Sequence, residues 1–313
     1  MNFLVVGLGS MGKRRVRCLQ ALGYRDVCGF DLRADRRKDA EERYGIRTFD
    51  NIEMAIKETA PHALIISVPP DAHHIVMKIA VQRRIHFFVE ASVVDTDMDI
   101  IRRAVDKAGT LGKVSNVIYH CGQYLPDWHT YEKVSDYYVS NPITGGAREI
   151  VPFELTWITD IFGLPRKVFG NVRRTIRIQG AEKIDDTYNC LLDYGDLLAT
   201  ITIDVVSRSA TRRLTINGDA RQLRWDWNKN AVELFDPAKN EWESISYEVQ
   251  KAAAGYNPNI GEQMYIDELR TFIEATQGKG KWVNSIADDH AVLKLLYAIE
   301  AADRAGSAQP GGA

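Results

Sequence analysis

The stretch Phe3–Leu19, "FLVVGLGSMGKRRVRCL", decides the fold. Four apolar residues lead directly into the pattern Gly7-x-Gly9-x-x-Gly12, and a helical pattern follows. A strand, a glycine-rich turn and a helix in this order begin a Rossmann βαβ unit. The first glycine permits the tight turn, and the third allows the helix to pack closely on the strand. The start of such a helix presents backbone N–H groups and a positive dipole end, which suit a pyrophosphate.

A carboxylate ends the second predicted strand. Asp31 follows Val27–Phe30, and it lies about twenty residues beyond the glycines, which is the spacing of a dinucleotide-binding unit. Its oxygens can accept hydrogen bonds from a ribose diol and would repel a 2′-phosphate, which favours NAD. Arg33, Arg36 and Arg37 follow closely and could meet a 2′-phosphate if Asp31 turned away, so NADP stays an alternative.

Two more predicted strands end at the same edge of the sheet. The apolar run Ala63–Val68 ends at Pro69-Pro70, and Phe87–Val89 runs into Glu90-Ala91-Ser92. The carboxyl ends of parallel strands meet at one edge, where open α/β sheets bind their ligands. The predicted cofactor-binding residues are Gly7, Leu8, Gly9, Ser10, Met11, Gly12, Asp31, Arg33, Ser67, Val68, Pro69, His73, Glu90 and Ala91.

Strand–helix alternation predicts a doubly wound parallel sheet in the first part of the chain, ending with a strand at Lys113–Ile118. After Tyr119 the pattern changes, and from Lys167 short runs of period two indicate an antiparallel meander. Two helices, near 261–277 and 286–305, close the chain. The predicted fold class is therefore α/β plus α+β, with a Rossmann domain at 1–119, an open, mainly antiparallel sheet domain flanked by helices at 120–305, and a flexible tail at 306–313.

Composition and charge narrow the functional classes. The formal net charge is -2 over 313 residues, which argues against a nucleic-acid groove or an anionic membrane surface. The basic run Lys13-Arg14-Arg15 is interpreted as a solvated helix face. No apolar run reaches membrane-spanning length and no signal-peptide pattern is present, so a cytoplasmic protein is expected. The four cysteines match no metal-binding spacing, and no metal is predicted.

The sequence as a whole resembles the Gfo/Idh/MocA oxidoreductases. The resemblance is carried by "VVGLGSMGKRR", "ISVPPDAHH", "FFVEAS", "TGGAREIVPFELTWITDIFG" and the C-terminal "YIDELRTFIEATQGKGK". Members of that family are generally NAD- or NADP-dependent dehydrogenases and reductases of sugars, inositols, nucleotide sugars and related polyols. The resemblance implies an NAD(P) cofactor and a small sugar-like substrate. It also implies a homodimer or homotetramer formed through the outer face of the second sheet.

Two departures from the family pattern concern the proton-transfer group. The family usually has Glu-Lys-Pro at the fifth strand end, and here Ala91 stands at the Lys position. The second family signature begins Gly-Gly and carries an Asp and then a His, but "GGAREIVPFELTWITDIFG" contains no His. Counting from Gly145-Gly146 puts Glu154 at the His position, whereas counting back from Phe162-Gly163 puts Glu149 at the Asp position.

Hydride transfer at an alcohol carbon requires a group that takes or gives the hydroxyl proton. The candidate catalytic residues are Glu154, His129 and Glu149, because burial raises the pKa of a carboxyl toward neutrality and His titrates there by itself. His129 lies in "GQYLPDWHTYE", whose aromatic and polar side chains suit a sugar ring and its hydroxyls. The candidate substrate-binding residues are Gln123, Tyr124, Trp128 and Arg148.

Three functions fit these observations. The first is an NAD(P)-dependent oxidoreductase that transfers a hydride between nicotinamide and a sugar or polyol, with a non-standard acid–base group. The second is an NAD-bound lyase, epimerase or hydrolase that oxidises a sugar transiently. The third is a non-catalytic, nucleotide-binding sensor, which the loss of both Lys and His favours. The complete glycine pattern and the polar, aromatic segment around His129 argue for an enzyme.

Overall fold

A computed structural model describes residues 1–90, 101, 104–105, 109–130, 132–247, 262–282, 284–307 and 309–310. The chain divides into two compact units. The first unit consists of Met1–Val93 and Gln250–Val283, and the second consists of Val94–Val249 and Asn284–Ala313. Each unit is described separately below.

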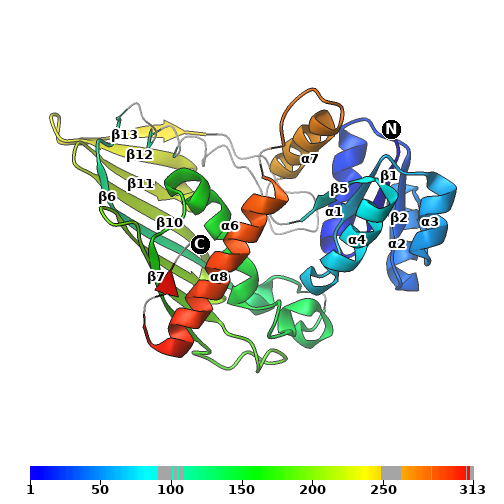
Figure 1. Ribbon diagram of the computed structural model, residues 1–313, viewed down its shortest axis with the longest axis horizontal. Helices are drawn as coiled ribbons and strands as arrows, with labels where there is room; N and C mark the ends of the chain where they lie inside the picture. Colours follow the sequence, from blue (N-terminus) through cyan, green and yellow to red (C-terminus); the bar gives the residue numbers. More distant parts are fainter. Residues whose placement is uncertain are drawn as a thin grey trace. The chain divides into compact units, whose positions relative to one another are not determined.

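The first unit contains a five-stranded parallel sheet in the order β3-β2-β1-β4-β5 (Figure 1). Its strands are β1 Phe3–Val6, β2 Val27–Phe30, β3 Arg47–Phe49, β4 Ala63–Ile66 and β5 His86–Val89. Its helices are α1 Ser10–Ala21, α2 Ala34–Tyr44, α3 Ile52–Thr59, the 3-10 helix η1 Pro70–Ala72, α4 His73–Arg83 and α7 Gln263–Thr276. The predicted doubly wound parallel sheet is confirmed, and β3 is a strand that the sequence pattern did not predict.

Helices cover both faces of this sheet. One core cluster combines β1 residues with Leu19 of α1 and Leu269 of α7, and the other combines them with Ile56 of α3 and Val76 of α4. All residues of β1 and β4 are buried, as expected for central strands of a parallel sheet that is covered on both sides. The carboxyl ends of these strands carry the glycine loop and Ser67.

The second unit contains a nine-stranded sheet among the described residues, in the order β13-β12-β11-β10-β6-β9-β8-β7-β14. Its strands are β6 Val114–Tyr124, β7 Lys167–Arg173, β8 Thr187–Asp193, β9 Leu198–Asp204, β10 Val206–Gly218, β11 Gln222–Asp226, β12 Ala231–Asp236, β13 Glu241–Ser246 and β14 Gln309–Pro310. Its helices are the 3-10 helices η2 Leu125–Asp127, η3 Val134–Asp136, η4 Tyr138–Ser140 and η5 Trp227–Lys229, with α6 Ala147–Phe162 and α8 Ile286–Ala305. The pairing is antiparallel except between β6 and β9, so the predicted sheet type is confirmed.

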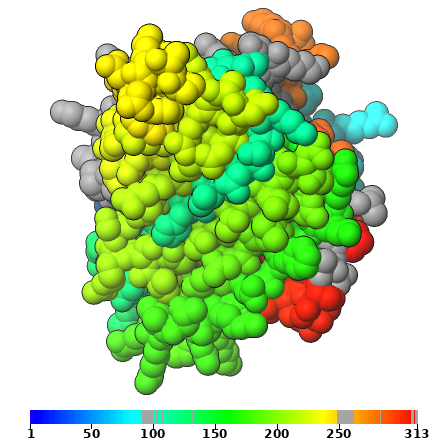
Figure 2. Space-filling model, turned by 90° about the vertical axis from the view of Figure 1, so that its left-hand side faces the viewer, coloured from blue at the N-terminus to red at the C-terminus, as the bar shows by residue number. Residues whose placement is uncertain are grey.

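One face of the second sheet packs against helices, and the other face is open. The long helices α6 and α8 lie on the same side of the sheet in Figure 1. Strand β6 turns Tyr119 and Cys121 into the core and Ile118 and His120 to the opposite face. Figure 2 shows this outer face, where β6 crosses the surface as a teal stripe between β10–β13 and β7–β9.

The strand predicted at Lys113–Ile118 as part of the Rossmann sheet lies elsewhere. It begins β6, which pairs with β9 and β10 in the second sheet, so β5 is the edge strand of the first sheet. The physical reason is its alternation: Val117 is buried and Ile118 is 50% exposed, whereas a strand covered on both faces would bury both. The predicted assignment of this strand is wrong.

The compact units also differ from the predicted division at 1–119, 120–305 and 306–313. Helix α7 joins the first unit, because Leu269 and Phe272 belong to the core cluster that contains β1 and α1. Near the C-terminus, Gln309 and Pro310 pair with β7, where a flexible tail was expected. The helices predicted near 261–277 and 286–305 are present as α7 and α8.

Candidate functional site

The glycine loop between β1 and α1 has the geometry that its sequence pattern predicts. Gly7 has φ +94°, and a Cβ there would lie 2.7 Å from the carbonyl oxygen of Ser67. A Cβ on Gly12 would lie 1.7 Å from the carbonyl oxygen of Gly7. Both positions therefore exclude any side chain, one through its backbone conformation and one through the close approach of α1 to the loop. Gly9 is the N-cap of α1 and adds no capping side chain in front of the helix.

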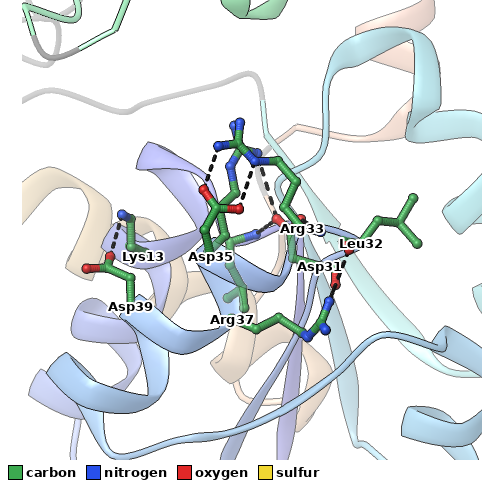
Figure 3. Close-up of polar contacts among 9 residues, drawn as sticks. Lys13, Asp31, Leu32, Arg33, Asp35, Arg37 and Asp39 are labelled. Atoms are coloured by element: carbon green, nitrogen blue, oxygen red, sulfur yellow. Dashed lines mark hydrogen bonds and ion pairs between the residues drawn. The ribbon is translucent and has the colours of Figure 1, made fainter.

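The Asp31 carboxylate lies beside this loop. Asp31 is 7% exposed, and its Oδ2 accepts the backbone N–H of Leu8 at 2.8 Å. Its Oδ1 accepts the backbone N–H of Arg33 at 2.9 Å (Figure 3). Each oxygen of an ionised carboxylate can accept a further hydrogen bond. The sequence-predicted pairing of a glycine loop with a strand-end carboxylate is thus assembled within the first unit.

The predicted residues after β4 also contact one another. Ser67 Oγ donates to Oε1 of Glu90 at 3.3 Å, which links the ends of β4 and β5. The ring nitrogen Nε2 of His73 lies 2.9 Å from the carbonyl oxygen of Val68, and Pro69 is the N-cap of η1. His73 therefore helps to hold the turn after β4. Ala91 lies outside the described residues.

A buried arginine holds Glu90 in a way that the sequence analysis missed. Arg15 Nε and Nη2 donate to Oε1 and Oε2 of Glu90 at 2.6 and 2.8 Å, and Nη2 lies 2.7 Å from Oε2 of Glu268 in α7. The guanidinium also stacks over the rings of Phe88 and Tyr265, at 4.6 and 5.1 Å from their centroids. Burial lowers the pKa of Arg15, but the two carboxylates hold it above its usual value. Glu90 is therefore an anchor of the β5 end.

The basic run Lys13-Arg14-Arg15 is thus only partly a solvated face. Arg14 is 5% exposed and Arg15 is 0% exposed, so that prediction is wrong for both residues. The missed signal is the helical spacing: Arg15 is on the same turn as buried Val16 and Leu19, which face the sheet. Only Lys13, which pairs with Asp39 at 2.7 Å, retains notable exposure.

We expect Arg15→Met to lower the free energy of unfolding by about 3–5 kcal/mol, because it removes the cation from a buried pair and leaves buried carboxylate unpaired. Urea unfolding monitored by circular dichroism measures the change. The control Arg43→Met breaks an exposed pair with Asp39 and should cost less than about 1 kcal/mol. Equal losses for the two variants would contradict the anchor role of Arg15.

In the second unit, a chain of aromatic contacts joins two candidate catalytic residues. His129 Nδ1 lies 2.7 Å from Oε1 of Glu132, and its ring stacks on Tyr137 with centroids 4.5 Å apart. Tyr137 meets Tyr138 edge to face at 6.1 Å, and the Tyr138 hydroxyl donates to Oε1 of Glu149. His129 and Glu149, 20 residues apart in the sequence, thus belong to one cluster.

Glu149 has the most unusual environment of the three candidates. It lies in the first turn of α6, and its Oε2 is buried with no hydrogen-bond partner among the described residues. Burial raises the pKa of the Glu149 carboxyl to about 8, although the hydrogen bond from Tyr138 acts in the opposite direction. The carboxyl is therefore largely protonated at neutral pH and titrates within the physiological range, as an acid–base group requires.

Glu154 lies five residues further along α6, about 140° around the helix from Glu149. It is 3% exposed and accepts hydrogen bonds from the Tyr119 hydroxyl at 2.5 Å and from Trp157 Nε1 at 2.9 Å. Its Oε1 lies 3.1 Å from Nη2 of Arg212. Both oxygens of Glu154 are engaged, and the carboxylate connects α6 to strands β6 and β10.

The candidate substrate-binding residues take different positions. Gln123 and Tyr124 end β6, and the Arg208 guanidinium lies 4.0 Å from the centroid of the Tyr124 ring. Trp128 packs against the core, and its Nε1 is buried without a hydrogen-bond partner among the described residues. Arg148 Nε donates to Oε1 of Glu300 at 2.6 Å, which connects α6 to α8. Of these four, Trp128 has a packing role and Arg148 forms an ion pair that joins two helices.

The raised pKa of Glu149 makes stability depend on pH. Between the ordinary carboxyl pKa of 4.5 and about 8, the folded state holds a proton that the unfolded state has lost. Stability from this group therefore falls as pH rises, by at most about 1.4 kcal/mol per pH unit. We expect Glu149→Gln to gain stability relative to wild type between about pH 5 and pH 8. Urea unfolding measures the difference in free energy of unfolding between Glu149→Gln and wild type at about pH 5 and about pH 8. The same difference at both pH values would contradict a buried, protonated Glu149 carboxyl.

No metal centre is assembled in the part of the chain that the structure describes, since no three His, Cys, Asp or Glu side chains gather as ligands. Among the same residues, no helix is both long and apolar enough to cross a membrane. Burial raises the pKa of the Cys18, Cys121 and Cys190 thiols to about 12, so these cysteines are structural.

Comparison with known proteins identifies the class. Residues 1–119 match the model of an oxidoreductase family with an NAD-binding Rossmann fold, and residues 100–224 match the GFO/IDH/MocA C-terminal domain. The first match defines an NAD-binding Rossmann domain of an oxidoreductase. With the second match, the chain belongs to the Gfo/Idh/MocA family, which confirms the resemblance seen in the sequence. No curated protein matches the sequence.

Solved structures share the fold over the full length. An oxidoreductase from Agrobacterium radiobacter, in complex with NAD+, L-tartaric acid and magnesium, has a TM-score of 0.82 at 12% identity, covering 99% of this chain and 98% of that one. A levoglucosan dehydrogenase, in complex with NADH and levoglucosan, has a TM-score of 0.78 at 12% identity, covering 99% of both chains. The WlbA dehydrogenase from Bordetella pertussis, in complex with NADH and UDP-GlcNAcA, has a TM-score of 0.76 at 14% identity, covering 99% and 98%. At these identities the likeness establishes the fold.

Proposed function

We propose that this protein is an NAD-dependent oxidoreductase that interconverts a hydroxyl and a carbonyl group on a small, sugar-like substrate. The observation that carries the proposal is the glycine loop with the Asp31 carboxylate beside it, in a chain of the Gfo/Idh/MocA family. The ligands of relatives with the same fold, namely levoglucosan, UDP-GlcNAcA and L-tartaric acid, support a substrate rich in hydroxyl groups.

The residues of the first unit fit NAD. Gly7 and Gly12 allow the tight turn and the close packing of α1, and Gly9, the second glycine of the pattern, has no side chain between its backbone and a pyrophosphate at the N-terminus of α1. The Asp31 oxygens are held by two backbone N–H groups and can each accept one more hydrogen bond, as a ribose diol would supply. Bound NAD accepts or supplies a hydride. NAD is favoured over NADP because the Asp31 carboxylate would repel a 2′-phosphate.

Glu149 is the proposed acid–base group. Ala91 stands where the family usually has Lys and cannot move a proton, so another group must take or give the substrate hydroxyl proton. Oε2 of Glu149 has no partner among the described residues, and the Tyr138 hydroxyl holds Oε1 and thereby orients the carboxyl. Glu154 is less suited, because three donors already occupy its oxygens.

The decisive experiment follows NADH formation with a panel of sugars, polyols and sugar acids. We expect Glu149→Gln to lower kcat by about 10²–10⁴-fold without weakening the binding of NAD, because the substitution removes the proton acceptor and keeps the shape of the side chain. In wild type, alcohol oxidation should increase with pH around an apparent pKa of about 8. The matched controls are Glu154→Gln and His129→Ala. Full activity in Glu149→Gln together with loss in either control would reassign the acid–base role.

The alternative functions give different results in the same experiment. NADH that stays bound through purification, without net turnover of added NAD, would indicate a lyase, epimerase or hydrolase that oxidises its substrate transiently. NAD binding with no reaction on any substrate would indicate a nucleotide-binding sensor. If NAD neither raises the melting temperature nor changes the intrinsic fluorescence of the wild-type protein, the proposed function is wrong.

We further propose that the protein is a homodimer, or a homotetramer built from such dimers, formed through the outer face of the second sheet. Ile118, Phe169 and Leu198 are 50%, 42% and 45% exposed, and each alternates with buried neighbours in its strand, so these side chains lie on the outer face, where apolar residues suit a partner. We expect Ile118→Glu to shift the mass in sedimentation toward the monomer. The control Leu32→Glu changes a residue of the first unit that is 79% exposed and should leave the mass unchanged. A cytoplasmic location stays a prediction.

A further inference from the structure

Asp31 is followed by Arg33, Arg36 and Arg37, whose side chains make different contacts. Arg37 Nη1 donates to the carbonyl oxygens of Asp31 and Leu32 at 2.8 and 3.1 Å, so it braces the turn after β2 (Figure 3). Arg36 Nη1 lies 3.7 Å from Oδ2 of Asp31, over the glycine loop, where a Cβ on Gly9 would lie 3.4 Å from the same nitrogen. Both residues are therefore bound to the elements that form the loop.

Arg33 is different, because its guanidinium pairs with a carboxylate outside the loop. Nη2 and Nε of Arg33 donate to Oδ2 and Oδ1 of Asp35 at 2.6 and 3.1 Å, and the two side chains face each other in Figure 3. The side chains are 52% and 65% exposed. The hydrogen bond from Arg33 lowers the pKa of Asp35 to about 2, so the carboxylate is charged at any physiological pH.

Arg33 offers Asp35 the fork formed by Nε and Nη2, and a fork of this kind also binds phosphate. A guanidinium makes two parallel hydrogen bonds to a carboxylate or to a phosphate, and it cannot serve both with the same two N–H groups. The backbone N–H of Arg33 is bonded to Oδ1 of Asp31, so its side chain starts next to the carboxylate that would accept the ribose 2′-hydroxyl. A 2′-phosphate at that hydroxyl would compete with Asp35 for Arg33.

We infer that Asp35 is a second determinant of coenzyme choice, which acts by occupying the guanidinium of Arg33. This inference rests on the proposed function, since it assumes that NAD binds beside Asp31. Asp31 repels the 2′-phosphate directly, whereas Asp35 withholds the arginine that would bind it. Because exposed pairs contribute little to stability, Asp35 can be changed without unfolding α2. Asp35 is thus a positioning residue and has no contact with the reacting atoms.

The test compares dissociation constants of NAD+ and NADP+, measured by titration calorimetry at low ionic strength. We expect Asp35→Ala to tighten the binding of NADP+ by about two- to fivefold, the range of an exposed charge pair, and to leave the dissociation constant of NAD+ within about 1.5-fold. The matched control Glu42→Ala removes a carboxylate from the same helix, where it pairs with Lys38 and not with Arg33. It should change neither constant.

The double variant Arg33→Ala/Asp35→Ala shows whether the effect passes through Arg33. We expect it to lose the gain in NADP+ affinity. If the gain persists, Asp35 acts only by its charge, and an unchanged ratio of the two constants in Asp35→Ala denies it any part in coenzyme choice. Either result overturns the inference while NAD+ binding still stands. Absence of NAD+ binding in wild type would instead overturn the proposed function.

Discussion

The guanidinium of Arg15 is the interaction on which the first unit depends. It connects α1 to the end of β5 through Glu90 and to α7 through Glu268, three elements that lie far apart in the sequence. Arg15 and Glu268 are fully buried and the Glu90 side chain is 16% exposed, so the cost of removing these charges from water is offset only while all three stay together. Helix α7 is thereby fixed to a sheet whose strands all precede it by more than 170 residues. The Arg15 guanidinium therefore joins α1, which directly follows the glycine loop, to the end of β5 and to α7.

On helix α6, two glutamates of one helix have opposite properties because of what surrounds them. Glu154 faces the sheet and accepts hydrogen bonds from Tyr119, Trp157 and Arg212. Glu149 is buried with one donor, Tyr138, among the described residues, and burial raises the pKa of its carboxyl to about 8. The surroundings of the two side chains, and not their residue type, give Glu154 a fixed ionic contact and Glu149 a titrating carboxyl.

The sequence predicts features whose cause is local and misses those whose cause is distant. The glycine loop and Asp31 follow from residues that are close in the chain, and both lie where they were expected. The burial of Arg15 depends on Glu90 and Glu268, which lie 75 and 253 residues away, so a local charge pattern could not show it. The period of two predicts the second sheet. The same period is present in β6, where the sequence analysis predicts a strand of the Rossmann sheet instead.

The same limit applies to the acid–base group. Counting along the family signature left Glu149 and Glu154 as alternatives, because one residue of length decides between them. Apart from Trp157 of α6 itself, their hydrogen-bond partners come from η4, β6 and β10, and no spacing in α6 predicts which carboxyl will meet a cation. Glu149 is buried without a cation among the described residues, whereas Glu154 pairs with Arg212. This difference exists only in the folded chain.

The proposed use of a buried carboxyl, in a family that usually has a lysine, has a consequence for the direction of the proposed reaction. A group with a pKa of about 8 is mostly protonated at neutral pH, so Glu149 begins as a proton donor there. A donor serves carbonyl reduction, in which the new hydroxyl oxygen needs a proton, whereas alcohol oxidation needs the ionised form. Under the proposed function, the protein is therefore equipped for reduction near neutrality and for oxidation above about pH 8, where Glu149 has lost its proton. Because oxidation releases a proton, the equilibrium alone changes the ratio of forward to reverse kcat/KM by about tenfold per pH unit at every pH. The pKa of Glu149 sets where each rate bends: kcat/KM for oxidation should fall below about pH 8, and kcat/KM for reduction should fall above it.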